Sequence, residues 1–196
     1  MSWKNTPSRC GGVSQALHWL VVALILLQGV LGLLMVDMPN SPDKIRAYAL
    51  HKSIGLTILA LAALRLPWRL YAGTPLPVAG TPRWQLAAAK VSHALLYALL
   101  FAIPLSGWLF NSAAGFPLQW FGLFNLPSIA ATDPGLREVA GAAHEWLFWL
   151  LVAVALIHAA AAFYHHLSVR DATLARMLPR GWLRAPDPAQ EDSRDA

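Results

Sequence analysis

Histidine is the residue type in this chain best placed to carry chemistry. The chain has seven histidines, and ionisable side chains in apolar segments are costly and usually functional. Five of them lie in or at the edges of long apolar segments: His18, His51, His93, His144 and His158. His144 and His158 are 14 residues apart, which in a helix is about 21 Å and nearly four turns. This spacing on one helix face favours two separate sites over one compact metal site.

The segments that carry these histidines are typical of a membrane protein. The chain is 57% hydrophobic and 13% charged, whereas about a quarter of the residues in soluble domains are charged. Four apolar segments, approximately residues 18–36, 50–66, 91–110 and 143–163, approach the roughly 20 helical residues that cross a bilayer core. The sequence therefore predicts an all-α integral membrane four-helix bundle over residues 1–185. Residues 186–196 are polar and aperiodic, which predicts a disordered tail.

The helices are expected to begin outside the lipid and to run longer than their apolar cores. Ser14, Ser41, Thr81 and Asp133 are the expected capping residues, and a proline follows each of the last three. Pro104 lies inside the third segment and is expected to kink that helix. The first segment ends without a small-x-small cleavage site, which predicts a retained span and not a secretory signal.

The loops differ in their content of lysine and arginine, which predicts the orientation. One side has 11 basic residues: Lys4, Arg9, Arg65, Arg69, Arg83, Lys90, Arg170, Arg176, Arg180, Arg184 and Arg194. The other side has 4: Lys44, Arg46, Lys52 and Arg137. Both termini are therefore expected in the cytoplasm. Because the basic residues lie at segment ends and not along one polar face, no nucleic-acid partner is expected.

Opposite helix directions bring the histidines to two matched depths. His18 opens the first segment on the inner side, where the inward-running fourth segment brings His158. His51 opens the second segment on the outer side, level with His144. The two pairs predict two haems, each held by two axial histidines, an arrangement that suits electron transfer. Isolated hydrogen-bonded bundle histidines are the alternative. With no C-x-x-C-H motif, the haems are expected to be non-covalent b haems.

Several neighbouring residues are candidates to support such haems. Arg65 and Arg69 on the inner side, and Arg46, Lys52 and Arg137 on the outer side, are candidate partners of haem propionates; each is equally well explained as an orientation charge. Small residues that offer room for flat macrocycles, or that simply pack helix pairs, are Gly29, Gly32, Gly55, Gly107 and Gly141.

The remaining histidines have other assignments. His93 is a candidate contact for a propionate or a quinone head group, together with Trp19 or Arg65. On the outer side, Lys52 with Trp146 or Glu145 is the corresponding quinone candidate, and the sequence does not choose between the faces. His165 is the main rival ligand to His158. It lies 21 residues from His144, about 31 Å along a helix, which would place a haem at the bilayer edge.

The segments around these residues resemble the bacterial cytochrome b561 family in order along nearly the whole chain. The resembling stretches are residues 17–20 (LHWL), 51–55 (HKSIG), 64–66 (LRL), 92–97 (SHALLY), 144–145 (HE), 157–162 (IHAAAA) with His165-His166, and the segments 170–174 (RDATL) and 177–180 (MLPR). The resemblance implies an inner-membrane four-helix bundle with two non-covalent b haems. Its ligand pattern falls on His18, His51, His144 and His158. It also implies electron transfer to or from quinone, with superoxide as the donor in at least one member.

Three functions remain open from the sequence. The first is an oxidoreductase that passes electrons from superoxide or another small donor to ubiquinone. The second is an electron-carrying cytochrome b subunit that docks on a periplasmic or membrane redox protein. The third is a metal or proton transporter. The outer loops carry four basic residues against five acidic ones, Asp37, Asp43, Asp133, Glu138 and Glu145, which does not favour attraction of an anionic donor.

Overall fold

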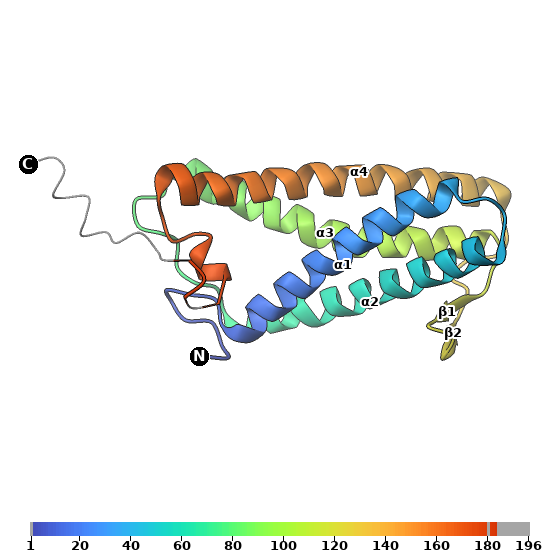
Figure 1. The fold of residues 1–196 in the computed structure, drawn as a ribbon, viewed down its shortest axis with the longest axis horizontal. Helices are drawn as coiled ribbons and strands as arrows, with labels where there is room; N and C mark the ends of the chain where they lie inside the picture. Colours follow the sequence, from blue (N-terminus) through green and yellow to red (C-terminus); the bar gives the residue numbers. More distant parts are fainter. Residues whose placement is uncertain (1, 180, 184–196) are drawn as a thin grey trace, which may run out of the picture.

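Four long helices run back and forth along one axis in the part of the chain that the computed structural model describes, residues 2–179 and 181–183 (Figure 1). They are α1 (Gly12–Asp37), α2 (Pro42–Ala72), α3 (Arg83–Ala113) and α4 (Pro134–Tyr164). A π-helical turn, His165–Val169, continues α4, and a short 3-10 helix, Ala175–Met177, follows. Two short strands, β1 (Leu118–Trp120) and β2 (Phe124–Leu126), lie between α3 and α4. The predicted tail, residues 186–196, lies outside the described residues.

The surface of the bundle is largely apolar. Each helix is long and apolar enough to cross a membrane, and large side chains such as Leu26 and Leu156 are 66% and 65% exposed. Exposed leucines around a helix are expected where the surroundings are lipid and not water. The predicted all-α membrane bundle is confirmed.

The core is small and lies where α1, α2 and α3 meet. Helix α1 packs chiefly on α2, and α3 on α4. The buried cluster consists of Val21, Ile54, Ile58, Ala62 and Leu100. Because much of the apolar surface faces lipid, this narrow core and the polar contacts between helices fix how the helices sit together.

Two of the expected helix caps are present. The Ser41 hydroxyl accepts a hydrogen bond from the Lys44 backbone N–H at 3.3 Å, and the Asp133 carboxylate accepts one from the Leu136 N–H at 2.9 Å. In both helices a proline occupies the first turn. The cap and the proline together explain why these helices begin where the sequence predicts.

The other two cap predictions are wrong. Helix α1 begins at Gly12, so Ser14 lies inside it, and its hydroxyl accepts a hydrogen bond from Trp68 Nε1 at 3.0 Å. The Thr81 hydroxyl donates to the Val78 carbonyl at 2.8 Å, and α3 begins at Arg83 with no side-chain cap. In each case the hydroxyl forms a hydrogen bond with another residue and does not cap the first turn of the helix.

Three segments meet at one end of the bundle, which we call the terminal end. The Leu76 N–H, in the α2–α3 connection, donates to the Pro7 carbonyl at 2.8 Å, and the Cys10 N–H donates to the Arg176 carbonyl at 3.3 Å. Trp19 Nε1 donates to the Met177 carbonyl at 2.8 Å. The segments before α1 and after α4 therefore cover the end of the bundle that carries His18 and His158.

The opposite end carries the β1–β2 hairpin, and we call it the hairpin end. Leu118 pairs with Leu126 and Trp120 with Phe124 in an antiparallel register. The all-α prediction from the sequence does not include this hairpin. The signal that would have found it is Gly122 between two short stretches rich in aromatic residues, bounded by prolines.

Candidate functional site

The predicted histidine pairs come together at two depths of the bundle. The ring centroids of His18 and His158 are 6.5 Å apart, and those of His51 and His144 are 6.2 Å apart. Each pair joins two helices, α1 with α4 at the terminal end and α2 with α4 at the hairpin end. Within the described residues there is no group of three or more histidine, cysteine, aspartate or glutamate side chains arranged to hold a metal ion. The arrangement is two separate pairs and not one cluster.

The spacing within each pair fits two axial ligands of one metal. A metal–imidazole bond is about 2.0 Å long, so two rings on opposite sides of one metal have centroids roughly 6 Å apart. Both measured separations are close to this value. The similarity of the two pairs is not required by helix packing alone, because the pairs share only α4 and their other members, His18 and His51, lie on different helices.

At the hairpin end, two glycines lie directly against the histidine rings. A Cβ on Gly32 of α1 would lie 3.1 Å from His51 Cε1, and a Cβ on Gly107 of α3 would lie 3.0 Å from His144 Cε1. Both distances are shorter than ordinary van der Waals contacts. The absence of a side chain at these two positions therefore sets where the two imidazoles can lie.

Hydrogen bonding selects the tautomer of His144. Its Nδ1 lies 2.9 Å from the Ile103 carbonyl oxygen and 3.1 Å from Ser106 Oγ, and that hydroxyl also donates to Ile103. Because a carbonyl only accepts, Nδ1 carries the proton and Nε2 keeps its lone pair for a metal. The Nδ1 of His51, in contrast, is buried and has no hydrogen-bond partner.

At the terminal end, Arg65 contacts His18 directly. A guanidinium nitrogen of Arg65 lies 3.0 Å from His18 Nδ1. Since a guanidinium only donates, this contact makes Nδ1 the acceptor and puts the proton of neutral His18 on Nε2. Ligation of a metal by Nε2 therefore requires Arg65 to leave Nδ1. The side chain would then be free to bind another anion or acceptor nearby.

His93 lies closer to its neighbours than the sequence analysis expected. Its ring centroid is 5.2 Å from that of His158, a shorter separation than His18 shows. At the terminal end, His158 of α4 thus has two imidazole neighbours, His18 of α1 and His93 of α3. The sequence predicts a propionate or quinone contact for His93, and its closeness to His158 depends on the relative heights of α3 and α4, which only the structure supplies.

The other candidate glycines pack against different side chains. Gly29 lies against Phe148, Gly55 against Gln28, and Gly141 against Phe110. These three glycines allow close packing between helices and do not make room beside the paired histidines. Only Gly32 and Gly107 face the paired histidines.

The candidate cations divide between the two ends. At the terminal end, the guanidinium groups of Arg65 and Arg69 lie 5.4 Å and 5.8 Å from the ring centroid of Tyr97. At the hairpin end, Lys52 Nζ donates to Asn111 Oδ1 at 3.2 Å and to the Pro117 carbonyl at 3.1 Å. Lys52 therefore ties α2 to α3 and to the segment that leads into the hairpin.

The other two outer cations also have neighbours that occupy them. Arg46 forms an exposed ion pair with Asp43 at 3.1 Å, and the Arg137 guanidinium lies 5.8 Å from the centroid of the Phe110 ring. The contacts of these two residues are therefore with Asp43 and Phe110, and not with the paired histidines.

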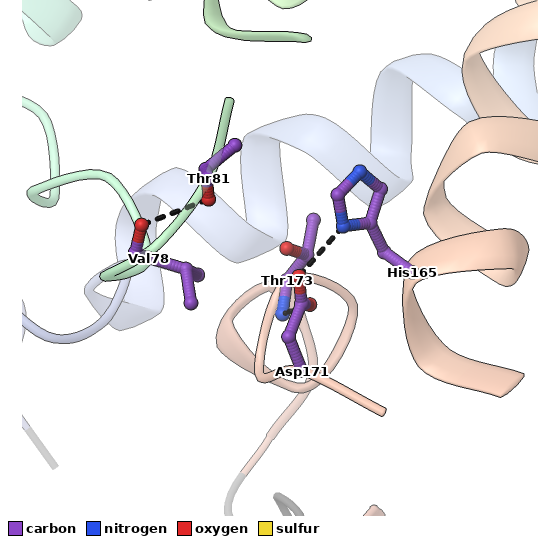
Figure 2. A network of polar contacts seen from close by, with 5 residues as sticks. All are labelled: Val78, Thr81, His165, Asp171 and Thr173. Carbon is purple, nitrogen blue, oxygen red and sulfur yellow. Dashed lines mark hydrogen bonds and ion pairs between the residues drawn. The ribbon is translucent and has the colours of Figure 1, made fainter. Parts of the chain in front are cut away.

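His165, the alternative ligand to His158, contacts the segment after α4 that covers the terminal end (Figure 2). Its Nδ1 lies 2.6 Å from an Asp171 carboxylate oxygen, and the other carboxylate oxygen accepts the Thr173 N–H at 2.7 Å. Burial tends to raise the pKa of Asp171, but the hydrogen bonds from Thr173 and His165 outweigh it and hold that pKa below its ordinary value. This contact fastens the segment after α4 to the end of the helix.

The tryptophans proposed as quinone contacts, Trp19 and Trp146, have different surroundings in the structure. Trp19 uses its N–H on the Met177 carbonyl, and its ring packs edge-on against His18 with a centroid separation of 5.3 Å. Trp146 is 76% exposed. At the terminal end, all three residues named from the sequence lie against a paired histidine: Trp19 and Arg65 against His18, and His93 against His158.

Comparisons with known proteins agree with this architecture. The family model of prokaryotic cytochrome b561 matches residues 9–180. Cytochrome b561 homolog 2 of Escherichia coli strain K12 is 38% identical over 179 residues, which cover 91% of this chain and 95% of that protein. The probable superoxide oxidase CybB of Yersinia pestis is 30% identical over 165 residues, which cover 84% and 92%. The chain therefore belongs to the prokaryotic cytochrome b561 family, and it is a multi-pass bacterial membrane cytochrome of the b type.

Proposed function

We propose that this chain is a dihaem cytochrome that transfers electrons between a small donor and ubiquinone. His18 and His158 would hold one haem, and His51 and His144 the other. The observation that carries the proposal is the pair of nearly equal ring separations, 6.5 Å and 6.2 Å, at two depths of the bundle. A haem iron with two histidine ligands supplies reversible one-electron chemistry and has no open position for oxygen.

The protein's own part is to orient the ligands and to keep water away from them. The Ile103 carbonyl holds the His144 ring by Nδ1, and the glycines at 32 and 107 let the rings approach. At the terminal end, Arg65 is the candidate partner for a haem carboxylate, because ligation by His18 requires it to leave Nδ1. Arg69 lies on the same side, beside Tyr97.

We place the exchange of quinone at the terminal end. A quinone head group needs hydrogen-bond partners beside an apolar wall. His93, next to His158, offers a ring nitrogen there, with Arg65 and Tyr97 close by. At the hairpin end, Lys52 already uses donors on Asn111 and Pro117, and Trp146 points outward.

The test is the oxidation of reduced protein by quinone. Dithionite-reduced, desalted protein is mixed with a soluble ubiquinone analogue, and the alpha band is followed by stopped flow. The rate is expected to saturate with quinone and to fall about tenfold or more in His93→Ala, the effect of losing roughly one good hydrogen bond. Lys52→Ala is the matched control and should keep the wild-type saturation. Oxidation that does not saturate and is unchanged in both variants would support a subunit that docks on another redox protein.

Superoxide is the first donor to test, because a relative bears the name probable superoxide oxidase. In the balanced reaction, two superoxide ions each lose one electron and become O₂, while one ubiquinone takes two electrons and two protons. The segments of the hairpin end carry four basic residues against five acidic ones, and Arg46 pairs with Asp43. Electrostatic capture of an anion is therefore weak there, and reduction by superoxide should depend little on ionic strength.

The proposed orientation places the terminal end in the cytoplasm and the hairpin end in the periplasm. Eight of the eleven basic residues on the predicted inner side belong to the described residues, and they lie in segments or helix turns of the terminal end: Lys4, Arg9, Arg65, Arg69, Arg83, Lys90, Arg170 and Arg176. A reporter that is active only in the periplasm, fused after residue 196, should therefore be inactive, and a cytoplasmic reporter should be active. The reverse pattern would invert the topology.

A further inference from the structure

The hairpin at residues 118–126 presents an apolar surface that the four-helix bundle leaves uncovered. No residue from Phe116 to Leu126 is charged. Phe116 is 61% exposed, Leu123 72% and Phe124 55%. Charged or polar side chains are usual at the tip of a hairpin in water. This composition indicates that the tip faces something less polar.

The backbone of the hairpin turn favours the same reading. Phe121 has a φ of 48°, in the left-handed region, and Gly122 follows with a φ of 71°. A bulky side chain rarely adopts that conformation, and glycine or asparagine would adopt it without cost. An aromatic residue at this position of the turn is unfavourable for the hairpin itself, so a contact made by its side chain is the simplest reason for it.

Contacts with α2 fix the depth of the hairpin. Trp120 Nε1 donates to Thr57 Oγ1 at 3.1 Å, and the Phe121 N–H donates to Ser53 Oγ at 2.9 Å. The apolar part of α2 begins near Leu50, so Ser53 and Thr57 lie about 5 Å and 10 Å further along the helix axis. Elements that lie in the membrane interface are buried about 5–10 Å into the boundary between headgroups and acyl chains.

The direction of the hairpin agrees with this depth. Figure 1 shows that β1 and β2 project sideways from the bundle near the start of α2, across the helix axis. A hairpin directed this way runs along the membrane surface and not away from it. Its backbone can tolerate the hydrated interface, though not the hydrocarbon core, because β1 and β2 pair with each other and headgroup water reaches their outer edges. The Ser53 hydroxyl also accepts the Phe121 N–H and donates to the Gln119 carbonyl.

We propose that the hairpin is an interfacial anchor whose tip, Phe121 to Phe124, inserts into the outer-leaflet lipid beside α2. The occupant of this surface is lipid because the hairpin continues the lipid-facing surface of the helices at the depth of the acyl boundary. The anchor holds α2 and the loop that Lys52 contacts at a fixed height in the bilayer. The proposal rests on the membrane placement of the helices and is independent of how haem or quinone is bound.

Site-specific fluorescence tests the anchor. The single cysteine, Cys10, is first replaced by serine. Leu123→Cys is then labelled with bimane in the full-length protein, reconstituted at one copy per phosphatidylcholine nanodisc. Ser128→Cys, which is exposed in the same loop but outside the hairpin, is the matched control. Phe124→Cys is a second hairpin site in case Leu123→Cys does not fold.

The label at Leu123 should be quenched several-fold more by lipid with a nitroxide near its headgroup than the label at Ser128, and several-fold less by aqueous iodide. Equal access of iodide to both labels would overturn the proposal and would favour a surface for a soluble partner. Protection at Leu123 that is absent with one copy per nanodisc and appears only in larger nanodiscs that hold two copies would also overturn it, in favour of contact with a second copy.

Discussion

Replacement of His51 or His144 by alanine is expected to remove one haem and leave the other in place. Each imidazole would be one of the two ligands of the proposed haem iron, and the two rings lie 6.2 Å apart. Within the described residues, no other histidine ring makes a close contact with this pair. A lost ligand would therefore have no substitute. A pyridine haemochrome assay should give half the wild-type ratio of haem to protein.

The test of the terminal-end pair needs a different set of variants, because His158 has two histidine neighbours. His158→Ala should also lose one haem, because His158 is the member that faces both His18 and His93. His18→Ala alone is expected to lose less, since His93 lies near enough to His158 to replace the missing ligand. The double variant His18→Ala with His93→Ala should lose the haem fully, and His93→Ala alone should keep both. If His158→Ala or His144→Ala kept both haems six-coordinate and low-spin, the pairing would be wrong.

Enlarging Gly107 or Gly32 should weaken the hairpin-end haem without removing a ligand. A Cβ at Gly107 would lie 3.0 Å from His144 Cε1, and one at Gly32 would lie 3.1 Å from His51 Cε1. The histidine ring must then shift, and loss of groups that orient a metal ligand typically costs about 10- to 100-fold in affinity. Gly107→Ala should lose haem faster to an apo-globin acceptor than the wild type, and Gly107→Leu should bind one haem only.

The control for this prediction is Gly29, which lies one turn from Gly32 on α1. Gly29→Ala brings a Cβ to 3.3 Å from a ring carbon of Phe148, so it tests close packing without touching a histidine. Its haem content should match the wild type. An equal loss of haem in Gly29→Ala and Gly107→Ala would attribute the effect to helix packing and would remove the positional role of Gly107.

The fold class and the pairing of histidines by depth were within reach of the sequence. Apolar length predicts the spans, because a bilayer core has a fixed thickness. The 14-residue interval between His144 and His158 corresponds to about 21 Å along a helix, because the rise per residue is fixed. Successive spans cross the membrane in opposite directions, and this alternation determines which histidines lie at the same depth. These are local or one-dimensional properties, and the structure brings the predicted pairs together.

The surroundings of those histidines were decided only by the tertiary structure. Five glycines looked equivalent in the sequence, yet only Gly32 and Gly107 lie against the paired rings, because the rotation of each helix about its axis is set by packing. His93 joins the terminal-end histidines because α3 and α4 pack together along their lengths.

The partners of polar side chains are likewise set by tertiary contacts. Ser14 serves Trp68 and does not cap α1, and Arg65 reaches His18 Nδ1. The hairpin depends on Ser53 and Thr57 of α2, which bond to it from more than 60 positions away in the chain. The sequence by itself thus determined the number of spans, their lengths and the levels of the histidines, which depend on length, polarity and helical rise. Only the tertiary structure decided which side chains meet at each level, because those contacts join residues that are distant along the chain.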